Sequence, residues 1–175
     1  PPLHESYEKF YSFSREQAMQ AVSYYREYYE EKGMFENEVY PGIKQLLRDL
    51  IKQGVLCLVA TSKPEIYAKK ILDYYELSNY FYYIAGANMD GTRTDKAEVI
   101  AYALKQIPAE YSNKKVLMVG DRSHDIIGAK KNGIDCAGVL FGYGSREELE
   151  EAGADFVADS VEAVRNIVFL NAAKN

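Results

Sequence analysis

The sequence contains no tryptophan and only two cysteines and two histidines among 175 residues. Cys57 and Cys136 each lie within an apolar run, which predicts two reduced, buried thiols rather than a disulfide framework. No apolar run approaches the roughly 20 residues of a membrane-spanning helix, and the first residues do not resemble a signal peptide. Basic residues number 21 against 26 acidic ones, so the formal net charge of −5 lacks the footprint of a nucleic-acid-binding protein. These absences predict a cytoplasmic protein without nucleic-acid or membrane partners.

What the chain does have is a globular composition, with 47% hydrophobic and 27% charged residues. After residue 38, apolar runs alternate with helical patterns, which predicts a Rossmann-like α/β fold with a parallel sheet covered by helices. The predicted strands are residues 55–60, 82–85, 116–119, 136–140 and 156–158. The predicted helices are a segment opened by Pro41 and closed by Gly54, then residues 64–75, 96–106, 123–132, 146–152 and 161–170.

Residues 1–38 carry a different pattern, helical and rich in tyrosine, which predicts a small module separate from residues 39–175. Ser14 begins a capping box ahead of a predicted helix over residues 14–32. That helix carries a cluster of four tyrosines, Tyr24, Tyr25, Tyr28 and Tyr29. Packing of the rings is the first interpretation, and a substrate-facing surface is the alternative.

Polar side chains follow two of the predicted elements. In α/β folds of this kind, ligands bind beyond the carboxyl ends of the strands. The hydroxyl and backbone N–H groups of Thr61 and Ser62 are candidate phosphate donors, and a helix N-cap is the alternative for Ser62. Lys96 begins a predicted helix, where a cation opposes the helix dipole. This mismatch indicates a role such as phosphate binding, with a solvated surface lysine as the alternative.

A pair of carboxylates follows the predicted strand at residues 116–119. Gly120 permits a tight turn, Asp121 stands at the strand end, and Asp125 lies in the first turn of the next predicted helix. The four-residue step can aim both carboxylates at one point, and with waters and a phosphate oxygen they form a ligand set that Mg²⁺ prefers. Complementing the helix dipole is the alternative role of Asp125. The segment therefore predicts a Mg²⁺ site.

Taken in order, these segments resemble the haloacid dehalogenase-like phosphohydrolases, especially the phosphoglycolate phosphatase-like branch with a helical cap. The resemblance covers about residues 38–170 and rests on the order of several motifs rather than on any one of them. The matching pieces are Leu58-Val59-Ala60-Thr61-Ser62-Lys63, Lys96 before a helix, Val119-Gly120-Asp121-Arg122-Ser123-His124-Asp125 leading into Ile126-Ile127-Gly128-Ala129-Lys130-Lys131-Asn132-Gly133, and Phe141-Gly142-Tyr143-Gly144-Ser145.

This resemblance implies a Mg²⁺-dependent phosphomonoester hydrolase that works through an aspartyl-phosphate. It implies that Thr61 bonds the phosphoryl oxygens and that Lys96 neutralises both the phosphate and the nucleophile. It implies that Asp121 is the direct metal ligand and that Asp125 holds the metal or its waters. Ser62 is a further candidate for phosphate binding. Secondary candidates for substrate contact, for which a solvated surface charge is the alternative, are Lys63, Arg93 and Arg122.

One part of the family pattern is missing from these residues. The first motif of the family is an apolar strand followed by Asp-x-Asp-Gly-Thr, which supplies the nucleophile and the general acid, yet residues 1–40 contain no aspartate. The segment 88–92 contains Asp-Gly-Thr but has Asn88 at the nucleophile position, so it is predicted to be a turn. We therefore expect a chain that begins at Pro1 within a partial cap, lacks the central strand and is inactive alone. The strands before Thr61 and Asp121 would then each have an unpaired edge.

The predicted substrate is a small phosphate ester such as phosphoglycolate. A 5'-nucleotidase-type phosphatase of the same family is one alternative, because the tyrosine-rich helix suits a leaving group that carries a ring. A non-catalytic module that binds a phosphorylated ligand is the alternative from another class. A receiver-type signalling domain would place its acidic pair early in the chain, and a nicotinamide-binding domain would need a glycine-rich turn after its first strand, so both are disfavoured.

Overall fold

The computed structural model describes residues 3–172, and contacts divide the chain into two compact units, Pro1–Glu38 and Val39–Asn175. The elements of the first unit are α1 (Leu3–Tyr11), α2 (Arg15–Glu31) and a 3₁₀ turn at Gly33–Phe35. Ser14 Oγ accepts from Gln17 N, and Gln17 Oε1 accepts from Ser14 N, which is the predicted capping box. The prediction of a helix over residues 14–32 is confirmed, whereas the sequence pattern does not single out α1.

The tyrosines of α2 lie mainly at the surface. Tyr24 is 62% exposed and Tyr28 is 51% exposed, while the buried side chains of this helix are Ala18 and Val22. Tyr24 and Tyr28 are therefore not core residues, whereas the rings of Tyr25 and Tyr29 stack with centroids 5.5 Å apart, as the packing interpretation predicts. A phenol can stay at the surface because its hydroxyl remains hydrated, and the Tyr28 hydroxyl also donates to Glu36 at 2.5 Å.

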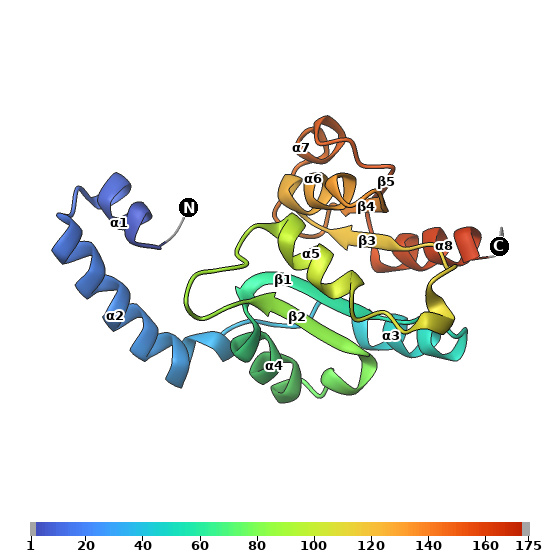
Figure 1. The fold of residues 1–175 in the computed structure, drawn as a ribbon, viewed down its shortest axis with the longest axis horizontal. Coiled ribbons are helices and arrows are strands. Elements are labelled where there is room, and N and C mark those ends of the chain that lie inside the picture. The colour runs from blue at the N-terminus through green and yellow to red at the C-terminus, as the bar shows by residue number, and fades with distance from the viewer. Residues whose placement is uncertain (1–2, 173–175) are drawn as a thin grey trace. The chain divides into compact units, whose positions relative to one another are not determined.

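The second unit alternates strands and helices (Figure 1). Its strands are β1 (Leu58–Pro64), β2 (Tyr83–Ala87), β3 (Leu117–Gly120), β4 (Asp135–Val139) and β5 (Phe156–Ala158). Its α-helices are α3 (Ile43–Lys52), α4 (Glu65–Tyr74), α5 (Lys96–Leu104), α6 (Ser123–Lys131), α7 (Arg146–Glu151) and α8 (Val161–Ala172). Short 3₁₀ turns lie at Ser78–Tyr80 and Ala109–Tyr111. No helix of the described residues is both long and apolar enough to cross a membrane.

The five strands form two parallel sheets (Figure 1). In the first sheet β1 pairs with β2, and Ala60 lies opposite Ala85. In the second sheet β4 lies between β3 and β5, and Val119 lies opposite Ala137. Every pairing is parallel and helices connect successive strands, because parallel neighbours need a long crossover. The prediction of a Rossmann-like parallel α/β fold covered by helices is confirmed.

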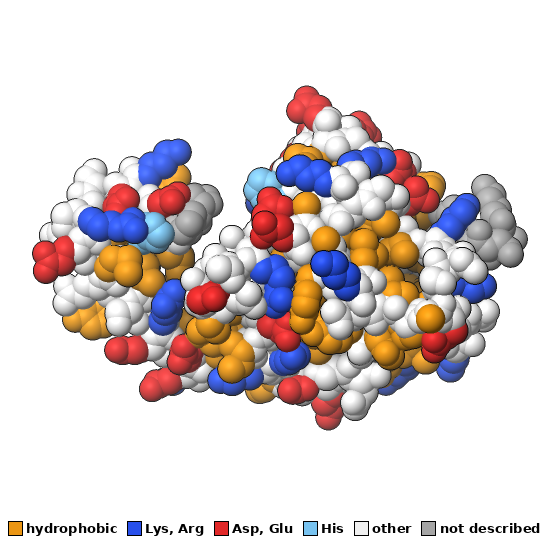
Figure 2. Space-filling view, in the orientation of Figure 1, with side chains coloured by type: hydrophobic (Ala, Val, Ile, Leu, Met, Phe, Trp, Pro, Cys, Tyr) orange, Lys and Arg blue, Asp and Glu red, His pale blue; other side chains and the backbone are white. Residues whose placement is uncertain are grey.

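Within the described part of the chain, β1 and β3 each have a hydrogen-bonded partner on one side alone. No residue of β1 is fully buried and Val119 of β3 is 39% exposed, whereas four of the five residues of β4 are buried. Figure 2 shows hydrophobic side chains at the surface in the region of α5 and β3. Interior strands of a parallel sheet are normally buried on both faces, so β1 and β3 have the exposure of edge strands within residues 3–172.

Two helices, α5 and α6, each form a hydrophobic core with one of the two sheets. Val99 of α5 packs in one cluster with Ala85 of the first sheet, and Ile126 of α6 packs in another with Cys136 of the second. The two helices also contact each other, closely at Gly128, where an added Cβ would lie 3.0 Å from side-chain atoms of α5. A third cluster, under α3 and α8, contains Leu46, Leu50, Val139, Ala158 and Val164. The α5–α6 pair thus connects the two sheets.

The first strand of the second unit lies later than the sequence predicts. Residues 55–57 precede β1, and Thr61 belongs to the strand itself, whose register shifts between Ala60 and Pro64. Val55 and Cys57 pack against the α3–α8 cluster, and the Cys57 carbonyl also accepts from Tyr82 N at 2.8 Å, directly before the β1–β2 pairing begins. Cys57 is half-buried, and burial raises the pKa of its thiol. Both cysteines are free thiols.

Candidate active site

Asp125 closes the turn between β3 and α6. Its Oδ2 accepts hydrogen bonds from the backbone N–H groups of Asp121 and Arg122, both at 3.1 Å. Its side chain is 8% exposed. A Cβ added to Gly120 would lie 2.3 Å from the Cβ of Asp125, so the carboxylate can fold back over the strand end because residue 120 is glycine. The turn holds one carboxylate oxygen, which leaves Oδ1 to face the site.

Asp121 directly follows β3, and its side chain contacts the loop that follows β4. Its Oδ2 accepts from the backbone N–H of Tyr143 at 2.9 Å. Two glycines allow this approach, because an added Cβ would lie 2.3 Å from the Asp121 Cβ at Gly142 and 2.1 Å from the Asp121 carbonyl oxygen at Gly144. The Phe-Gly-Tyr-Gly segment therefore packs closely around Asp121 and holds its carboxylate through the Tyr143 backbone N–H.

Lys96 is the first residue of α5, and its ammonium joins both sheets. Nζ donates to the carbonyl oxygen of Ala60 in β1 at 3.1 Å and pairs with Asp125 Oδ1 at 2.9 Å. The side chain is 16% exposed. Asp95 is the N-cap of α5, and its carboxylate accepts from Ala97 N at 2.8 Å. The buried ion pair accounts for a cation at a helix start, where the dipole disfavours one.

The other predicted phosphate-binding residues differ in where their side chains lie. Thr61 lies in the middle of β1, directly after Ala60, and its Oγ1 accepts from Lys63 N at 3.2 Å. Ser62 is exposed and is not the N-cap of α4, since Pro64 occupies that position. Arg93 bonds elsewhere: its contacts are the Gly86 carbonyl, Glu65 and the Tyr102 ring.

A recess of about 450 Å³ adjoins Lys96 on the α5–α6 surface. It is lined by Ser62, Thr94, Asp95, Lys96, Ala97, His124, Ile127, Gly128 and Lys131. Its charged lining residues are Lys96, Lys131 and Asp95. The recess therefore offers space beside the ion pair with both signs of charge at its wall.

Glu148 of α7 supports the start of α6, and the sequence motifs do not reveal it. Its Oε1 accepts from Ser123 N at 2.8 Å and from Arg122 Nε at 2.9 Å. These hydrogen bonds, led by the Ser123 backbone N–H, lower the pKa of Glu148 from 4.5 to about 2. Arg122 is thus committed to Glu148, and the same interaction raises the pKa of its guanidinium.

The carboxylate pair suits a hydrated Mg²⁺ better than a closed protein cage. Across residues 3–172, no group of three or more His, Cys, Asp or Glu side chains is placed to hold a metal. Mg²⁺ usually keeps several waters and takes one or two carboxylates plus a phosphate oxygen. Asp121 Oδ1 suits direct ligation because Oδ2 accepts from Tyr143, while Asp125 has both oxygens engaged and suits contact through water.

The second unit is thus a Rossmann-like core in which Lys96, Asp121 and Asp125 lie in or beside the segments that follow the strands. A family model described as haloacid dehalogenase-like hydrolase matches residues 1–139. A putative phosphatase structure from Clostridium difficile has a TM-score of 0.89 and 48% identity, covering 96% of this chain and 78% of that chain. The chain belongs to the haloacid dehalogenase-like hydrolase family.

Three of the curated relatives carry different names. A 5'-nucleotidase from Pseudomonas aeruginosa is 38% identical over 96% of this chain and 75% of its own length. A tyrosine-protein kinase PtkA from Mycobacterium tuberculosis is 39% identical over 90% of this chain, which spans about half of that relative, 53%. A phosphoglycolate phosphatase from Vibrio cholerae is 27% identical over 91% of this chain and 70% of its own length.

Proposed function

We propose that this site hydrolyses a small phosphomonoester through an aspartyl-phosphate, with Mg²⁺ as the cofactor. The observation that carries the proposal is the buried contact of Lys96 with Asp125 and with the Ala60 carbonyl of β1. Lys96 neutralises charge on the transferred phosphoryl group, and the Thr61 hydroxyl and Ser62 donate to its oxygens. Asp121 and Asp125 hold Mg²⁺, which when bound supplies further neutralisation of the phosphoryl charge.

The nucleophilic carboxylate is proposed to lie on a strand that pairs between β1 and β3. Both edges are open in the described chain, and a parallel strand between them would end beside Thr61 and Asp121. Its carboxylate oxygen attacks phosphorus, the bond to the leaving oxygen breaks, and that oxygen takes a proton from a general acid. Water then hydrolyses the aspartyl-phosphate and restores the carboxylate.

For the substrate, we place a nucleoside 5'-monophosphate ahead of phosphoglycolate. The relative named 5'-nucleotidase is 38% identical, against 27% for the relative named phosphoglycolate phosphatase. The recess beside Lys96 gives a leaving group larger than glycolate space next to the phosphate position.

The test compares the 175-residue chain with a version extended at its N-terminus by an apolar strand that ends in Asp-x-Asp-Gly-Thr. Both are assayed with Mg²⁺ on p-nitrophenyl phosphate, then on nucleoside monophosphates and phosphoglycolate. We expect turnover with the extended version alone, lost in Asp121→Ala. Turnover by the 175-residue chain that is lost in its Asp121→Ala variant would contradict the proposed source of the nucleophile.

Two further outcomes separate the alternatives. Equal or faster turnover of phosphoglycolate than of nucleoside monophosphates would overturn the proposed substrate order. An extended version that binds inorganic phosphate but hydrolyses none of these esters would support a phospho-ligand-binding module instead.

A further inference from the structure

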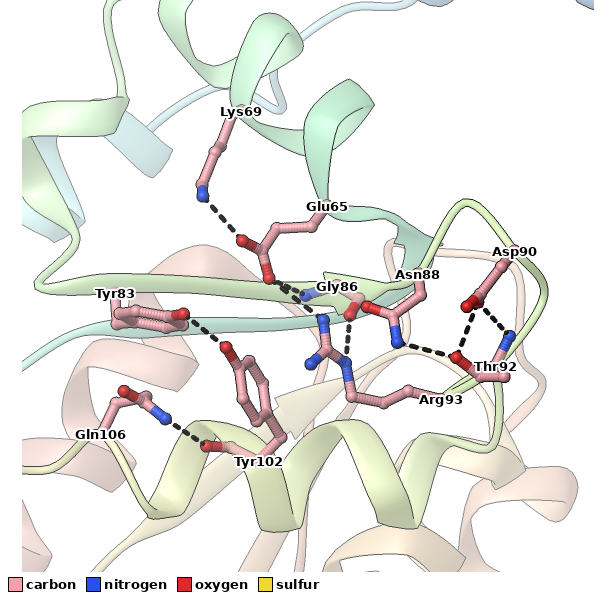
Figure 3. Close-up of polar contacts among 10 residues, drawn as sticks. All are labelled: Glu65, Lys69, Tyr83, Gly86, Asn88, Asp90, Thr92, Arg93, Tyr102 and Gln106. Carbon is pink, nitrogen blue, oxygen red and sulfur yellow. Dashed lines mark hydrogen bonds and ion pairs between the residues drawn. The ribbon is translucent and has the colours of Figure 1, made fainter.

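Arg93 joins three elements just ahead of α5 (Figure 3). Its Nε donates to the Gly86 carbonyl oxygen in β2 at 2.8 Å, and its Nη2 pairs with the Glu65 carboxylate at the start of α4 at 3.3 Å. The guanidinium lies over the Tyr102 ring of α5, 3.7 Å from its centroid. The Arg93 side chain is 19% exposed. One side chain therefore ties β2, α4 and α5 together.

The backbone at Arg93 is held in an unfavourable conformation. Its φ is +52°, in the left-handed region that residues with a Cβ rarely adopt. The preceding turn is closed by its own hydrogen bonds. Asp90 Oδ1 accepts from Thr92 N at 2.9 Å and from Thr92 Oγ1 at 2.7 Å, and Asn88 Nδ2 donates to Thr92 Oγ1 at 2.8 Å (Figure 3). The backbone N–H of Asn88 also donates to the Thr92 carbonyl at 3.0 Å. Such strain persists where surrounding contacts over-determine it, and the three contacts of Arg93 do so.

The ring that Arg93 covers has a fixed place in the core. The hydroxyls of Tyr102 and Tyr83 are 2.8 Å apart, and their rings meet edge to face at 5.9 Å (Figure 3). Because Tyr83 belongs to β2, the ring is anchored to the same sheet that Arg93 bonds through Gly86. Arg93 and Tyr102 together fix how α5 sits on the first sheet.

Lys96 follows Arg93 by three residues and begins α5. Its ammonium has to reach the Ala60 carbonyl and Asp125 at once, so a small shift of the first turn of α5 would lengthen one of these contacts. We infer that Arg93 is a positioning residue that holds the start of α5 so that Lys96 meets the phosphate site. Its significance for catalysis rests on the proposed phosphatase function. The expectation that Arg93 binds phosphate is set aside because its guanidinium is enclosed by Glu65, Gly86 and Tyr102.

Lysine cannot take over this role, because an ammonium lacks the planar fork that bonds two partners while stacking on a ring. Arg165 offers a matched control in the same unit. It lies over Phe169 at 5.2 Å and pairs with Asp49 at 3.4 Å, so it also combines a ring contact with an ion pair. Arg93→Lys and Arg165→Lys thus make the same chemical change at two places.

The experiment follows the Lys96 side chain by NMR in the full chain labelled with [¹³Cε]lysine, with the signal assigned by its loss in Lys96→Gln. We expect Arg93→Lys to move the Lys96 signal and to weaken binding of inorganic phosphate in the presence of Mg²⁺ by roughly tenfold. We expect Arg165→Lys to leave the Lys96 signal in place and to change the phosphate affinity by less than about twofold. An unmoved Lys96 signal in Arg93→Lys would overturn the inference.

Two milder variants keep the test decisive if Arg93→Lys folds poorly. Tyr102→Phe retains the ring under the guanidinium, whereas Glu65→Gln removes the charge that Arg93 pairs with. We expect Glu65→Gln to move the Lys96 signal more than Tyr102→Phe does, and the reverse order would contradict the assignment. If neither the chain nor its extended version binds phosphate, the proposed function fails, while the Lys96 signal in the 175-residue chain still decides the positioning role.

Discussion

The ion pair between Lys96 and Asp125 is the most enclosed charged contact described in this protein, with side chains 16% and 8% exposed. Burying charges is costly, and the attraction offsets that cost only when the remaining hydrogen-bonding capacity is satisfied. Here the Ala60 carbonyl accepts from the lysine, and two backbone N–H groups donate to the aspartate. Each partner is therefore needed to stabilise the other.

Removing the lysine leaves a buried carboxylate without its cation. We expect Lys96→Met to lower the free energy of unfolding by about 3 kcal/mol, measured by urea denaturation at pH 7. Adding Asp125→Asn to Lys96→Met removes the uncompensated charge, so the double variant is expected to recover part of the loss. A Lys96→Met variant as stable as the wild type would show that the pair is not coupled in solution.

Glu148 predicts a pH dependence. Hydrogen bonds from Ser123 and Arg122 hold its folded-state pKa at about 2, below its ordinary value of 4.5. Because the pKa is depressed on folding, the ionised group contributes stability above pH 4.5, and this contribution is lost as the pH falls from 4.5 toward 2. We expect Glu148→Gln to lower the urea midpoint at pH 7 and to flatten its decline toward about pH 3. Parallel declines in both proteins would contradict this role.

The sequence locates the site residues whose signals are local. Asp121 follows a strand end, Asp125 lies in the first turn of the next helix, and Lys96 opposes a helix dipole, so a few neighbouring residues suffice to single them out. The ion pair of Arg93 joins residues 28 apart, and the hydrogen bond between Arg122 and Glu148 joins residues 26 apart. Nothing local in the sequence specifies these partners, because the fold brings them together.

Among the elements, the tight turn after β3 depends on a residue without a side chain. An added Cβ at Gly120 would lie 2.3 Å from the Asp125 Cβ, and real atoms do not approach so closely. We expect Gly120→Ala to destabilise the fold by about 2 kcal/mol or more, because backbone and Asp125 must both shift. Gly91→Ala is the control, since its Cβ would meet no atom within 4 Å and only its φ of +85° is unfavourable. A smaller thermal shift for Gly120→Ala than for Gly91→Ala would count against this reading of the turn.

The helices and strands of the second unit follow the predicted order, since the alternation of apolar runs and helical patterns is strong. The boundary of β1 is where the prediction is wrong: residues 55–57 read as strand but precede it, and Val55 and Cys57 pack against the α3–α8 cluster. A short apolar run carries no information about whether burial comes from hydrogen-bonded pairing or from side-chain packing.

For the whole molecule, the open edges of β1 and β3 determine which backbone amides are protected from hydrogen exchange. β4 is paired on both sides, whereas β1 and β3 are each paired on one side within the described residues. We expect backbone amides of β4 to resist hydrogen exchange throughout, and those of β1 and β3 to alternate between slow and fast along the strand. Exchange followed by NMR tests this, and uniformly slow amides in β1 would mean that its free edge is covered in solution.

Lys96 also links the two sheets of the second unit. Its ammonium donates to Ala60 of β1 in the first sheet and pairs with Asp125, which closes the turn after β3 of the second sheet. An anion that binds the Lys96 ammonium competes with these two contacts. By thermodynamic reciprocity, the factor by which a bound anion changes the equilibrium constant for separating the two sheets equals the factor by which separating the sheets changes the affinity for the anion. Anion affinity and the equilibrium between joined and separated sheets therefore report on the same coupling free energy.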